Sequence, residues 1–270
     1  MNESIYEHIR VVNIDRVLPF EWYPGSEIAE AAPDTERTVV RNPYPVIRRD
    51  DRFLLLDDTR ALEWLRQKGV LHVPVQLCRP EQTRLLTRRL ALTGFTAADM
   101  QRLAGAYPEQ IRLCNEQESY PPEFLQASIQ FAQGEPQTLL LRHSTRTGCP
   151  TPLDYLFRAV LDHGRYAPML EPTSIPETPF KVIVPDAWLT LPSFTLEDLW
   201  SAAQSGRLFP TEIVEVRMSG RVVNIDFPMS VLEADLPIEE KEAFLKDLIL
   251  YRRQSCRTAC IEGPVYMLNR

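Results

Sequence analysis

The sequence predicts an α/β protein, and two features of the pattern lead to this prediction. Short apolar, β-branched runs alternate with one helical pattern in the first third of the chain, while later helical patterns begin at threonines that suit an N-cap. Apolar residues make up 44% of the 270 residues and charged residues 25%, which is typical of a globular protein. We expect two parts, residues 1–92 and residues 93–270.

The first part is expected to form a compact strand, turn, helix and strand unit. Leu62 and Leu65 have helical spacing, and Gly69 follows as the expected C-terminal stop. The charged turn RDD joins the predicted strands 43–49 and 52–57. The predicted strands are 9–14, 43–49, 52–57 and 72–77.

The second part is expected to mix helices and strands. A Ser-Gly pair at Ser219 and Gly220 predicts the turn of a hairpin within 212–228. The predicted helices are 81–92, 96–107, 151–164, 195–210 and 238–255. Further strands are predicted within 137–144, 181–186 and 263–268.

Composition and charge exclude several classes of function. The net charge of −7 argues against a dedicated nucleic-acid binder, although the basic run 84–90 would be the contact if DNA were bound. Neither GxxxxGK[ST] nor GxGxxG occurs, so a nucleotide would need another architecture. No signal peptide and no apolar run of membrane-spanning length is found, which predicts a cytoplasmic protein without membrane contact.

Glu21 is the first candidate for chemistry. It lies between Phe20 and Trp22 in a loop rich in proline and aromatic residues. Partial burial of a carboxylate raises its pKa, which makes it a better proton acceptor near neutral pH. The alternative is a loop glutamate beside two core aromatic residues.

The sequence Asp57-Asp58-Thr59-Arg60 is the second candidate, where a predicted strand ends and a helix begins. Adjacent carboxylates can hold Mg²⁺, and the amides at a helix N-terminus suit an anion. Asp58 could instead act as a simple cap. Arg60 could contact a phosphate or only pair with Asp57.

The third candidate is Ser219-Gly220-Arg221, at the tip of the predicted hairpin. A hydroxyl, a glycine and a guanidinium together can bind a carboxylate or a phosphate. Turn chemistry alone is the alternative explanation for these residues.

The stretches VVNIDRVLPFE, PYPVIRRDDRFLLLDDTRALEWLRQKGVLHVPVQ and VRMSGRVVNIDFPMSVL together resemble a known family. They resemble the free L-serine kinases of the ParB/sulfiredoxin-like superfamily, of the staphyloferrin B siderophore-pathway type. The resemblance implies a ParB-like nucleotide-binding domain over residues 1–92 and an α+β domain over 93–270 that completes the substrate site. It implies transfer of a phosphoryl group from ATP or ADP, with Mg²⁺, to the hydroxyl of free L-serine or a similar amino acid.

By position, the resemblance assigns roles to single residues. Glu21 falls on the family's catalytic glutamate, and Asp57 falls on the aspartate that opens its DGxHR signature, as a catalytic residue and metal ligand. Asp58, Thr59 and Arg60 are then the nucleotide-binding residues. Ser219 and Arg221 fall on a late SGR segment and are the expected substrate-binding pair.

The signature differs from the family pattern at three positions. Asp58 replaces its glycine, Arg60 its histidine and Ala61 its arginine, while a family tryptophan falls near Arg88. Asp58 adds a negative charge where a triphosphate would bind, unless Mg²⁺ or Arg60 compensates. Two functions therefore stay open: a small-molecule amino-acid kinase in a biosynthetic pathway, and a catalytically inactive ParB-like regulatory or binding protein.

Overall fold

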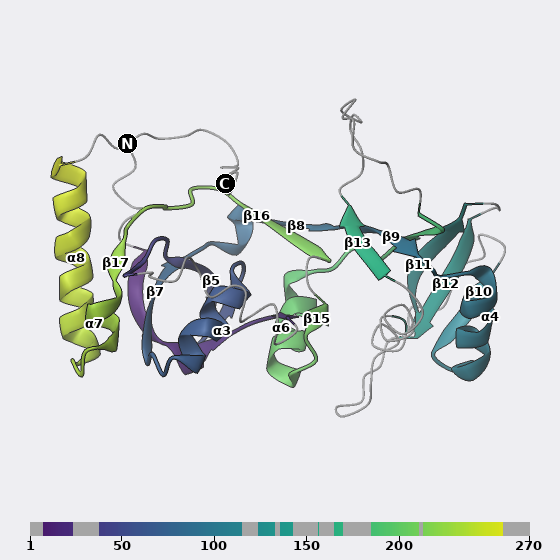
Figure 1. Cartoon of the computed structure of the whole chain (residues 1–270), viewed down its shortest axis with the longest axis horizontal. Coiled ribbons are helices and arrows are strands. Elements are labelled where there is room, and N and C mark those ends of the chain that lie inside the picture. Colours follow the sequence, from purple (N-terminus) through teal and green to yellow (C-terminus); the bar gives the residue numbers. More distant parts are fainter. Residues whose placement is uncertain are drawn as a thin grey trace. The chain divides into compact units, whose positions relative to one another are not determined.

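The computed structural model in Figure 1 divides into two compact units, and the predicted α/β class is confirmed. It describes residues 8–23, 38–114, 124–132, 136–142, 156, 165–169, 185–210 and 213–255. Unit 1 takes in the described parts of Met1–Leu85, Thr195–Thr211 and Val216–Arg270, and unit 2 those of Leu86–Phe194 and Glu212–Glu215. The expected division after residue 92 into two domains stays a prediction.

Unit 1 is built on a five-stranded mixed sheet with the order β1-β7-β5-β6-β2. Strand β7 reads HVPVQL and has four consecutive buried residues, as expected of a strand with a neighbour on each side. The strands are β1 Ile9–Asn13, β2 Val17–Leu18, β5 Tyr44–Arg49, β6 Arg52–Leu55 and β7 His72–Leu77. The predicted RDD turn joins β5 to β6, with Asp50 in the left-handed region at φ 55°.

Helix α3 (Thr59–Gln67) follows β6 and places Leu62 and Leu65 in the core. Gly69, at φ 74°, ends the helical segment in the left-handed conformation that favours glycine. The Arg66 guanidinium pairs with Glu63 and donates to the carbonyl oxygens of Ile14 and Val17. These contacts tie the helix to the chain around η1 (Ile14–Arg16) and β2.

The C-terminal part of unit 1 completes the same core. Phe227, Leu232 and Leu245 belong to one hydrophobic cluster with residues of β1, β5 and β7. The helices of this part are α6 Leu196–Ser205, α7 Met229–Glu233 and α8 Ile238–Ser255. Earlier in the chain, the short 3-10 helix η2 (Pro80–Gln82) follows β7. The predicted helices 195–210 and 238–255 are therefore confirmed, with Thr195 as N-cap and Gly206 as C-cap of α6.

Short strands link distant parts of the chain. β3 (Glu21–Trp22) pairs in parallel with β15 (Phe209–Pro210), and β4 (Val39–Val40) pairs with β17 (Phe227–Pro228). β8 (Thr83–Thr87) forms a two-stranded sheet with β16 (Val214–Met218).

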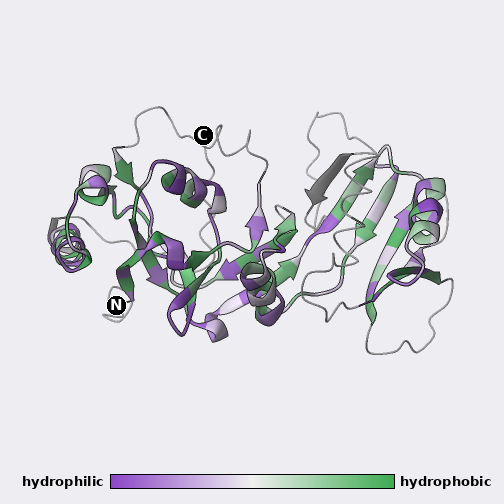
Figure 2. Ribbon diagram, turned by 90° about the horizontal axis from the view of Figure 1, so that it is seen from below, coloured by the Kyte–Doolittle hydropathy of each residue, from purple (hydrophilic) through white to green (hydrophobic). Residues whose placement is uncertain are grey.

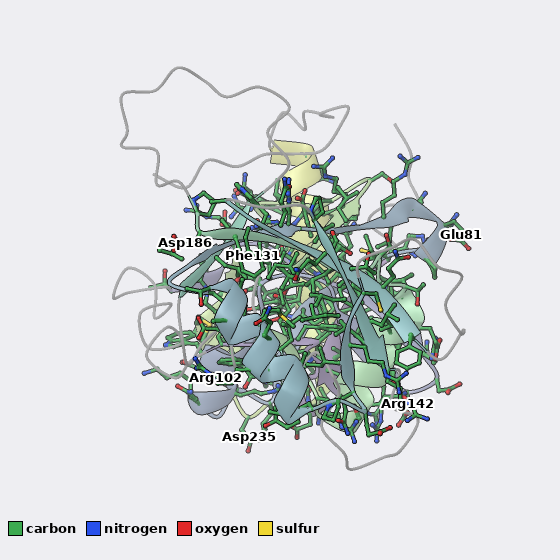
Figure 3. The ribbon with its side chains drawn as sticks, turned by 90° about the vertical axis from the view of Figure 1, so that its right-hand side faces the viewer. Glu81, Arg102, Phe131, Arg142, Asp186 and Asp235 are labelled. Atoms are coloured by element: carbon green, nitrogen blue, oxygen red, sulfur yellow. The ribbon has the colours of Figure 1, made fainter. Side chains whose placement is uncertain are left out.

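Unit 2 contains a six-stranded antiparallel sheet with the order β10-β12-β11-β14-β9-β13. Its strands carry both hydrophobic and hydrophilic residues (Figure 2). The strands are β9 Arg89–Thr93, β10 Ile111–Cys114, β11 Phe124–Phe131, β12 Gln137–Arg142, β13 Arg165–Met169 and β14 Ala187–Thr190. Asp186 lies beside Phe131 (Figure 3), and its carboxylate accepts a hydrogen bond of 2.6 Å from the amide of Gly94. Helix α4 (Ala97–Ala106) contacts β10 and confirms the helix predicted at 96–107.

Two sequence expectations are wrong. Residues 81–92, expected as a helix, form η2, β8 and most of β9, because β-strand partners far along the chain, β13, β14 and β16, supply pairings that the local pattern does not show. The hairpin expected at 212–228 is also absent from the described residues, since β16 pairs with β8 and β17 with β4. Except for Leu156, the helix expected at 151–164 lies outside the described residues, as do most of the strand expected at 181–186 and the strand expected at 263–268.

Candidate functional site

Glu21 and Asp57 each follow one of two strands that pair in parallel in unit 1. β2 and β6 run parallel, with Val17 opposite Phe53 and Leu18 opposite Leu54. Glu21 and Asp57 each come three residues after the last of these pairs. The two residues, 35 residues apart in the chain, thus follow neighbouring strands of one sheet.

Glu21 is only 8% exposed. Its position is fixed by the parallel pairing of β3 with β15, where the Phe209 amide donates to the Phe20 carbonyl oxygen over 2.7 Å. The Tyr23 hydroxyl donates to Glu21 Oε2 over 3.3 Å. Glu21 is therefore a buried carboxylate that accepts a hydrogen bond from Tyr23, rather than an exposed loop side chain.

Tyr23 connects this carboxylate to the start of helix α3. The Arg60 guanidinium carbon lies 5.3 Å from the centre of the Tyr23 ring, in a cation–π arrangement. Glu21 and Arg60, nominated separately from the sequence, thus contact the same side chain. Arg60 itself is exposed.

Asp57 is held on both carboxylate oxygens. Oδ1 accepts from the Asp58 amide over 2.8 Å, and Oδ2 accepts from Arg221 Nη1 over 2.6 Å. The ion-pair partner of Asp57 in the structure is Arg221, not Arg60, the alternative that the sequence left open. Two residues 164 apart in sequence, both nominated as site residues, are therefore in direct contact.

The start of helix α3 lacks a side-chain cap. Asp58 occupies the N-cap position at φ 66° and ψ 36°, in the left-handed region, and its side chain makes no capping hydrogen bond. The expectation that Asp58 caps the helix holds for the backbone position only. Thr59 is only 3% exposed, so the residue that was expected to contact the nucleotide is almost entirely buried. The left-handed backbone explains why a glycine suits this place in the family signature.

Gln76 is a site residue that the sequence reasoning did not assign. It is 5% exposed, its Nε2 donates to the Gly220 carbonyl oxygen over 2.7 Å, and its Oε1 accepts from the Val222 amide over 2.8 Å. The available signal was a polar residue within the otherwise apolar strand VPVQL. The Gln76 side chain therefore bonds to the main chain on both sides of Arg221.

Ser219 and Arg221 lie in the segment that Gln76 holds. Ser219 is exposed, and its amide donates to the Gln82 carbonyl oxygen over 3.3 Å. Gly220 turns the chain at φ 73°. The predicted substrate pair is thus placed by main-chain contacts, with Arg221 directed at Asp57.

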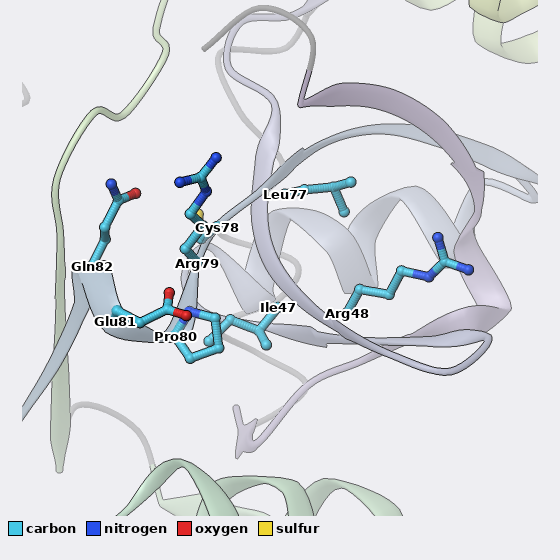
Figure 4. Close-up of a pocket in the computed structure, with 8 residues that line it drawn as sticks. All are labelled: Ile47, Arg48, Leu77, Cys78, Arg79, Pro80, Glu81 and Gln82. Atoms are coloured by element: carbon cyan, nitrogen blue, oxygen red, sulfur yellow. The ribbon is translucent and has the colours of Figure 1, made fainter. Parts of the chain in front are cut away.

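Cys78 is one of the residues that line a depression of about 540 Å³ (Figure 4). Its Sγ is 3.9 Å from Met218 Sδ. Burial raises the pKa of the Cys78 thiol to about 11, although the positive charge of Arg221 lowers it. Arg48 extends away from Arg79 in Figure 4. The depression is lined by Ile47, Arg48, Leu77, Cys78, Arg79, Pro80, Glu81 and Gln82.

The donor set limits the kind of metal site that is possible. Within the described residues, no cluster of three or more His, Cys, Asp and Glu side chains could hold a metal ion. Mg²⁺ does not need such a cluster, because it commonly binds one or two carboxylates together with phosphate oxygens and water. Asp57, whose side chain is 47% exposed, fits that more open arrangement.

Comparison with known proteins gives matches in structure only. No family model and no curated protein matches the sequence. Among solved structures, SbnI with a C-terminal truncation from Staphylococcus aureus matches with a TM-score of 0.75 and 15% identity, over 93% of this chain and 100% of that one. A free serine kinase mutant in complex with AMP matches with a TM-score of 0.60 and 14% identity, over 83% of this chain and 94% of that one.

The chain has the fold of free serine kinases. A second mutant of that kinase, in complex with ADP, matches with a TM-score of 0.58 and 13% identity over 83% of this chain. A conserved hypothetical protein from Pyrococcus furiosus matches with a TM-score of 0.56 and 14% identity, over 83% of this chain and 97% of that one. Within the described part of the chain, no helix combines the length and the apolar character that crossing a membrane requires.

Proposed function

We propose that the protein is a ParB-like small-molecule kinase that transfers a phosphoryl group from ATP or ADP to the hydroxyl of free L-serine or a similar amino acid. The proposal rests on two observations within unit 1: Glu21 is a buried carboxylate, and Asp57 forms an ion pair with Arg221. That unit belongs to a chain with the serine kinase fold, and solved structures of that kinase hold AMP or ADP. A cytoplasmic place in a biosynthetic pathway, such as that of a siderophore, fits this chemistry.

Glu21 acts as the general base in this proposal. The serine hydroxyl gives its proton to the Glu21 carboxylate as its oxygen forms a bond to the terminal phosphorus, and the bond from that phosphorus to the nucleotide oxygen breaks. The Tyr23 hydroxyl donates to Glu21 Oε2 and so helps to orient the carboxylate that receives the proton. Burial of the group supports this role, since desolvation favours a carboxylate that takes up a proton.

Positive groups near the start of α3 would neutralise the charge of the phosphates. The first amides of a helix have no intrahelical acceptor and point toward an anion bound at the N-terminus. Arg60 and Arg221 supply guanidinium groups, which suit phosphate oxygens. Asp57 would hold Mg²⁺, whose positive charge would offset the negative charges of Asp58 and of the phosphates.

The proposed site exchanges one partner for another when the nucleotide enters. Asp57 and Arg221 neutralise each other in the structure over 2.6 Å. Arg221 would then pair with a phosphate and Asp57 with Mg²⁺, so each side chain would keep a partner of opposite charge. This exchange avoids leaving either charge without compensation.

The test is an assay with ATP or ADP, Mg²⁺ and a panel of amino acids, with detection of the phosphorylated product. We expect product with serine or a close analogue, and none with Glu21→Ala. Absence of nucleotide binding would contradict the proposal.

A second function has one observation in its favour. The signature has lost the family's arginine, since Ala61 stands in its place and is 8% exposed in the core. A ParB-like regulatory protein that binds a nucleotide, or another partner, without turnover would be the result. Nucleotide binding measured by calorimetry without product from any amino acid would favour this function over the kinase.

A further inference from the structure

Gln76 holds the segment that carries Arg221. Its two hydrogen bonds go to the Gly220 carbonyl oxygen, over 2.7 Å, and to the Val222 amide, over 2.8 Å. These groups lie on the two sides of Arg221 in the chain. The main chain of Arg221 is therefore fixed by one side chain, from a strand more than 140 residues earlier.

The sheet register explains why Gln76 can do this. Pro45 of β5 lies opposite Gln76 of β7, and the Pro45 carbonyl oxygen accepts from the Leu56 amide over 2.9 Å. Gln76 and Leu56 therefore flank the same residue of β5, and Asp57 directly follows Leu56. We call the two hydrogen bonds from Gln76 to Gly220 and Val222 the clamp. The clamp and the Asp57 carboxylate are thus positioned by residues on the two sides of Pro45 in the sheet.

The carboxamide of Gln76 satisfies both contacts at neutral pH. The Gly220 carbonyl oxygen needs a donor and the Val222 amide needs an acceptor, and a glutamine side chain offers one of each. A carboxylate would accept from Val222 but repel Gly220, and a leucine would leave both groups without a partner. Both the carboxamide group of Gln76 and its length are therefore matched to the Gly220–Val222 main chain.

We propose that Gln76 is a positioning residue, which sets the Gly220–Val222 main chain so that Arg221 reaches Asp57 and, once the nucleotide is bound, its phosphate. The second half rests on the proposed function, while the clamp itself does not. Gln76 touches no reacting atom in this proposal and acts only through Arg221.

The first experiment measures the clamp directly. Hydrogen exchange of a peptide containing Val222 is compared between the native chain, Gln76→Leu and the control Gln67→Leu, an exposed glutamine at the end of α3. We expect faster exchange only in Gln76→Leu. Unchanged exchange there would overturn the proposal without reference to any ligand.

The second experiment is a cycle with Arg221, read out as the Kd for ADP with Mg²⁺ by calorimetry. We expect Gln76→Leu to weaken binding by about tenfold or more in the native background. In the Arg221→Ala background it should have no further effect, because the group that it positions is gone. Additive losses would overturn positioning through Arg221.

A glutamate at position 76 gives a readout that general damage to the fold would not move. When protonated, Gln76→Glu can donate to Gly220 and accept from Val222 as the amide does. Burial beside a carbonyl oxygen raises the pKa of a carboxyl group, although the charge of Arg221 opposes this and that of Asp57 adds to it. We expect its ADP affinity, relative to the native chain at the same pH, to recover as the pH falls from 8 to 5.5; no recovery would contradict the clamp.

The two proposals fail in different ways. If Arg221→Ala leaves ADP binding unchanged while Gln76→Leu still speeds exchange at Val222, the proposed function fails at Arg221 and the clamp stands. If Arg221→Ala abolishes binding and Gln76→Leu changes neither exchange nor affinity, the proposed function stands and the positioning role is wrong.

Discussion

Helix α3 begins differently from helices α4 and α6, and the difference marks the site. Thr96 and Thr195 each accept from the amide of the third helical residue, Asp99 or Asp198, whose carboxylate accepts in turn from the threonine amide. Helix α3 instead starts from Asp58 in a left-handed conformation without a side-chain cap. Helices α4 and α6 therefore provide a side-chain acceptor for one of their first amides, whereas α3 provides none from its N-cap residue.

The comparison teaches that local stability and site chemistry are separated in this chain. A capping box contributes to the stability of its own helix. The start of α3 is organised by distant residues, since Arg221 reaches Asp57 and Tyr23 reaches Arg60. Substitutions at the capped helices should therefore change stability, while those around α3 should change binding and turnover.

The largest effect is expected on the site side of this comparison. Glu21→Gln should lower turnover by about 10²- to 10⁴-fold, because the amide cannot take up the serine proton. The ADP affinity and the urea midpoint should stay close to native values, since the Tyr23 hydroxyl can still donate to the amide oxygen. Product formation and calorimetry with ADP and Mg²⁺ measure the two parts; equal turnover would remove Glu21 as the base.

The next effect belongs to the capped helices. Thr96→Ala and Thr195→Ala should each lower the free energy of unfolding by about 1 kcal/mol, because one helical amide loses its acceptor. Urea denaturation measures the loss, and the exposed Thr93→Ala serves as a control. A change in ADP affinity in either capping variant would break the separation between stability and site chemistry.

Two substitutions of Asp58 distinguish the effect of its charge on ADP affinity from the effect of its backbone conformation. Asp58→Asn removes the negative charge and keeps a side chain that tolerates the left-handed region, whereas Asp58→Gly also removes the side chain. Both should tighten ADP binding, by a few-fold or more, because repulsion of the phosphates is removed. The free energy of unfolding should change by less than about 1 kcal/mol in Asp58→Gly.

Affinity that rises in Asp58→Gly but not in Asp58→Asn would assign the effect to the backbone. Affinity that falls in both would show that Asp58 contributes to the site as it stands.

The smallest effect is expected at Cys78, which reports on the position of Arg221. Since burial raises its pKa to about 11, the thiol stays largely protonated and should react slowly with iodoacetamide at pH 8. Arg221→Ala should slow this reaction further, by less than about tenfold, because a charge that lowers the pKa is removed. Mass spectrometry of the Cys78 peptide gives the rate, with Arg252→Ala as the matched ion-pair control.

The same raised pKa sets a direction for stability. Between the ordinary pKa of 9.0 and about 11, the unfolded chain has lost a proton that the folded chain retains. The stabilising contribution of the Cys78 thiol is therefore complete below pH 9 and lost as the pH rises through 11. Cys78→Ser should reduce this part of the alkaline loss of stability.

The parts of the fold that were predictable are those with local signals. Strands β5, β6 and β7 and helix α3 follow from apolar runs, a charged turn and a terminal glycine that lie close together in sequence. Residues 81–92 failed because their leucines fit a helical period as well as a strand, and the strands that pair with them lie more than 70 residues later along the chain. Local periodicity cannot decide such a segment.

The candidate site was predictable as a set of residues but not as a set of contacts. Glu21, Asp57 and Arg221 were nominated from their neighbours in sequence and from the family resemblance. Their arrangement depends on the parallel register of β2 with β6 and on the clamp by Gln76, which are long-range features. A buried polar residue inside an apolar strand was the one available sign of that clamp.

The distance in sequence between Asp57 and Arg221 has a consequence for how the protein comes into being. A growing chain leaves the ribosome from its N-terminus, so Glu21, Asp57 and Gln76 emerge long before the segment around Gly220. Until that segment is made, Asp57 lacks its guanidinium partner and Gln76 lacks both of its hydrogen-bond partners. Under the proposed function, nucleotide binding is therefore a late event in synthesis, and a nascent chain stalled before residue 219 should not yet retain ADP.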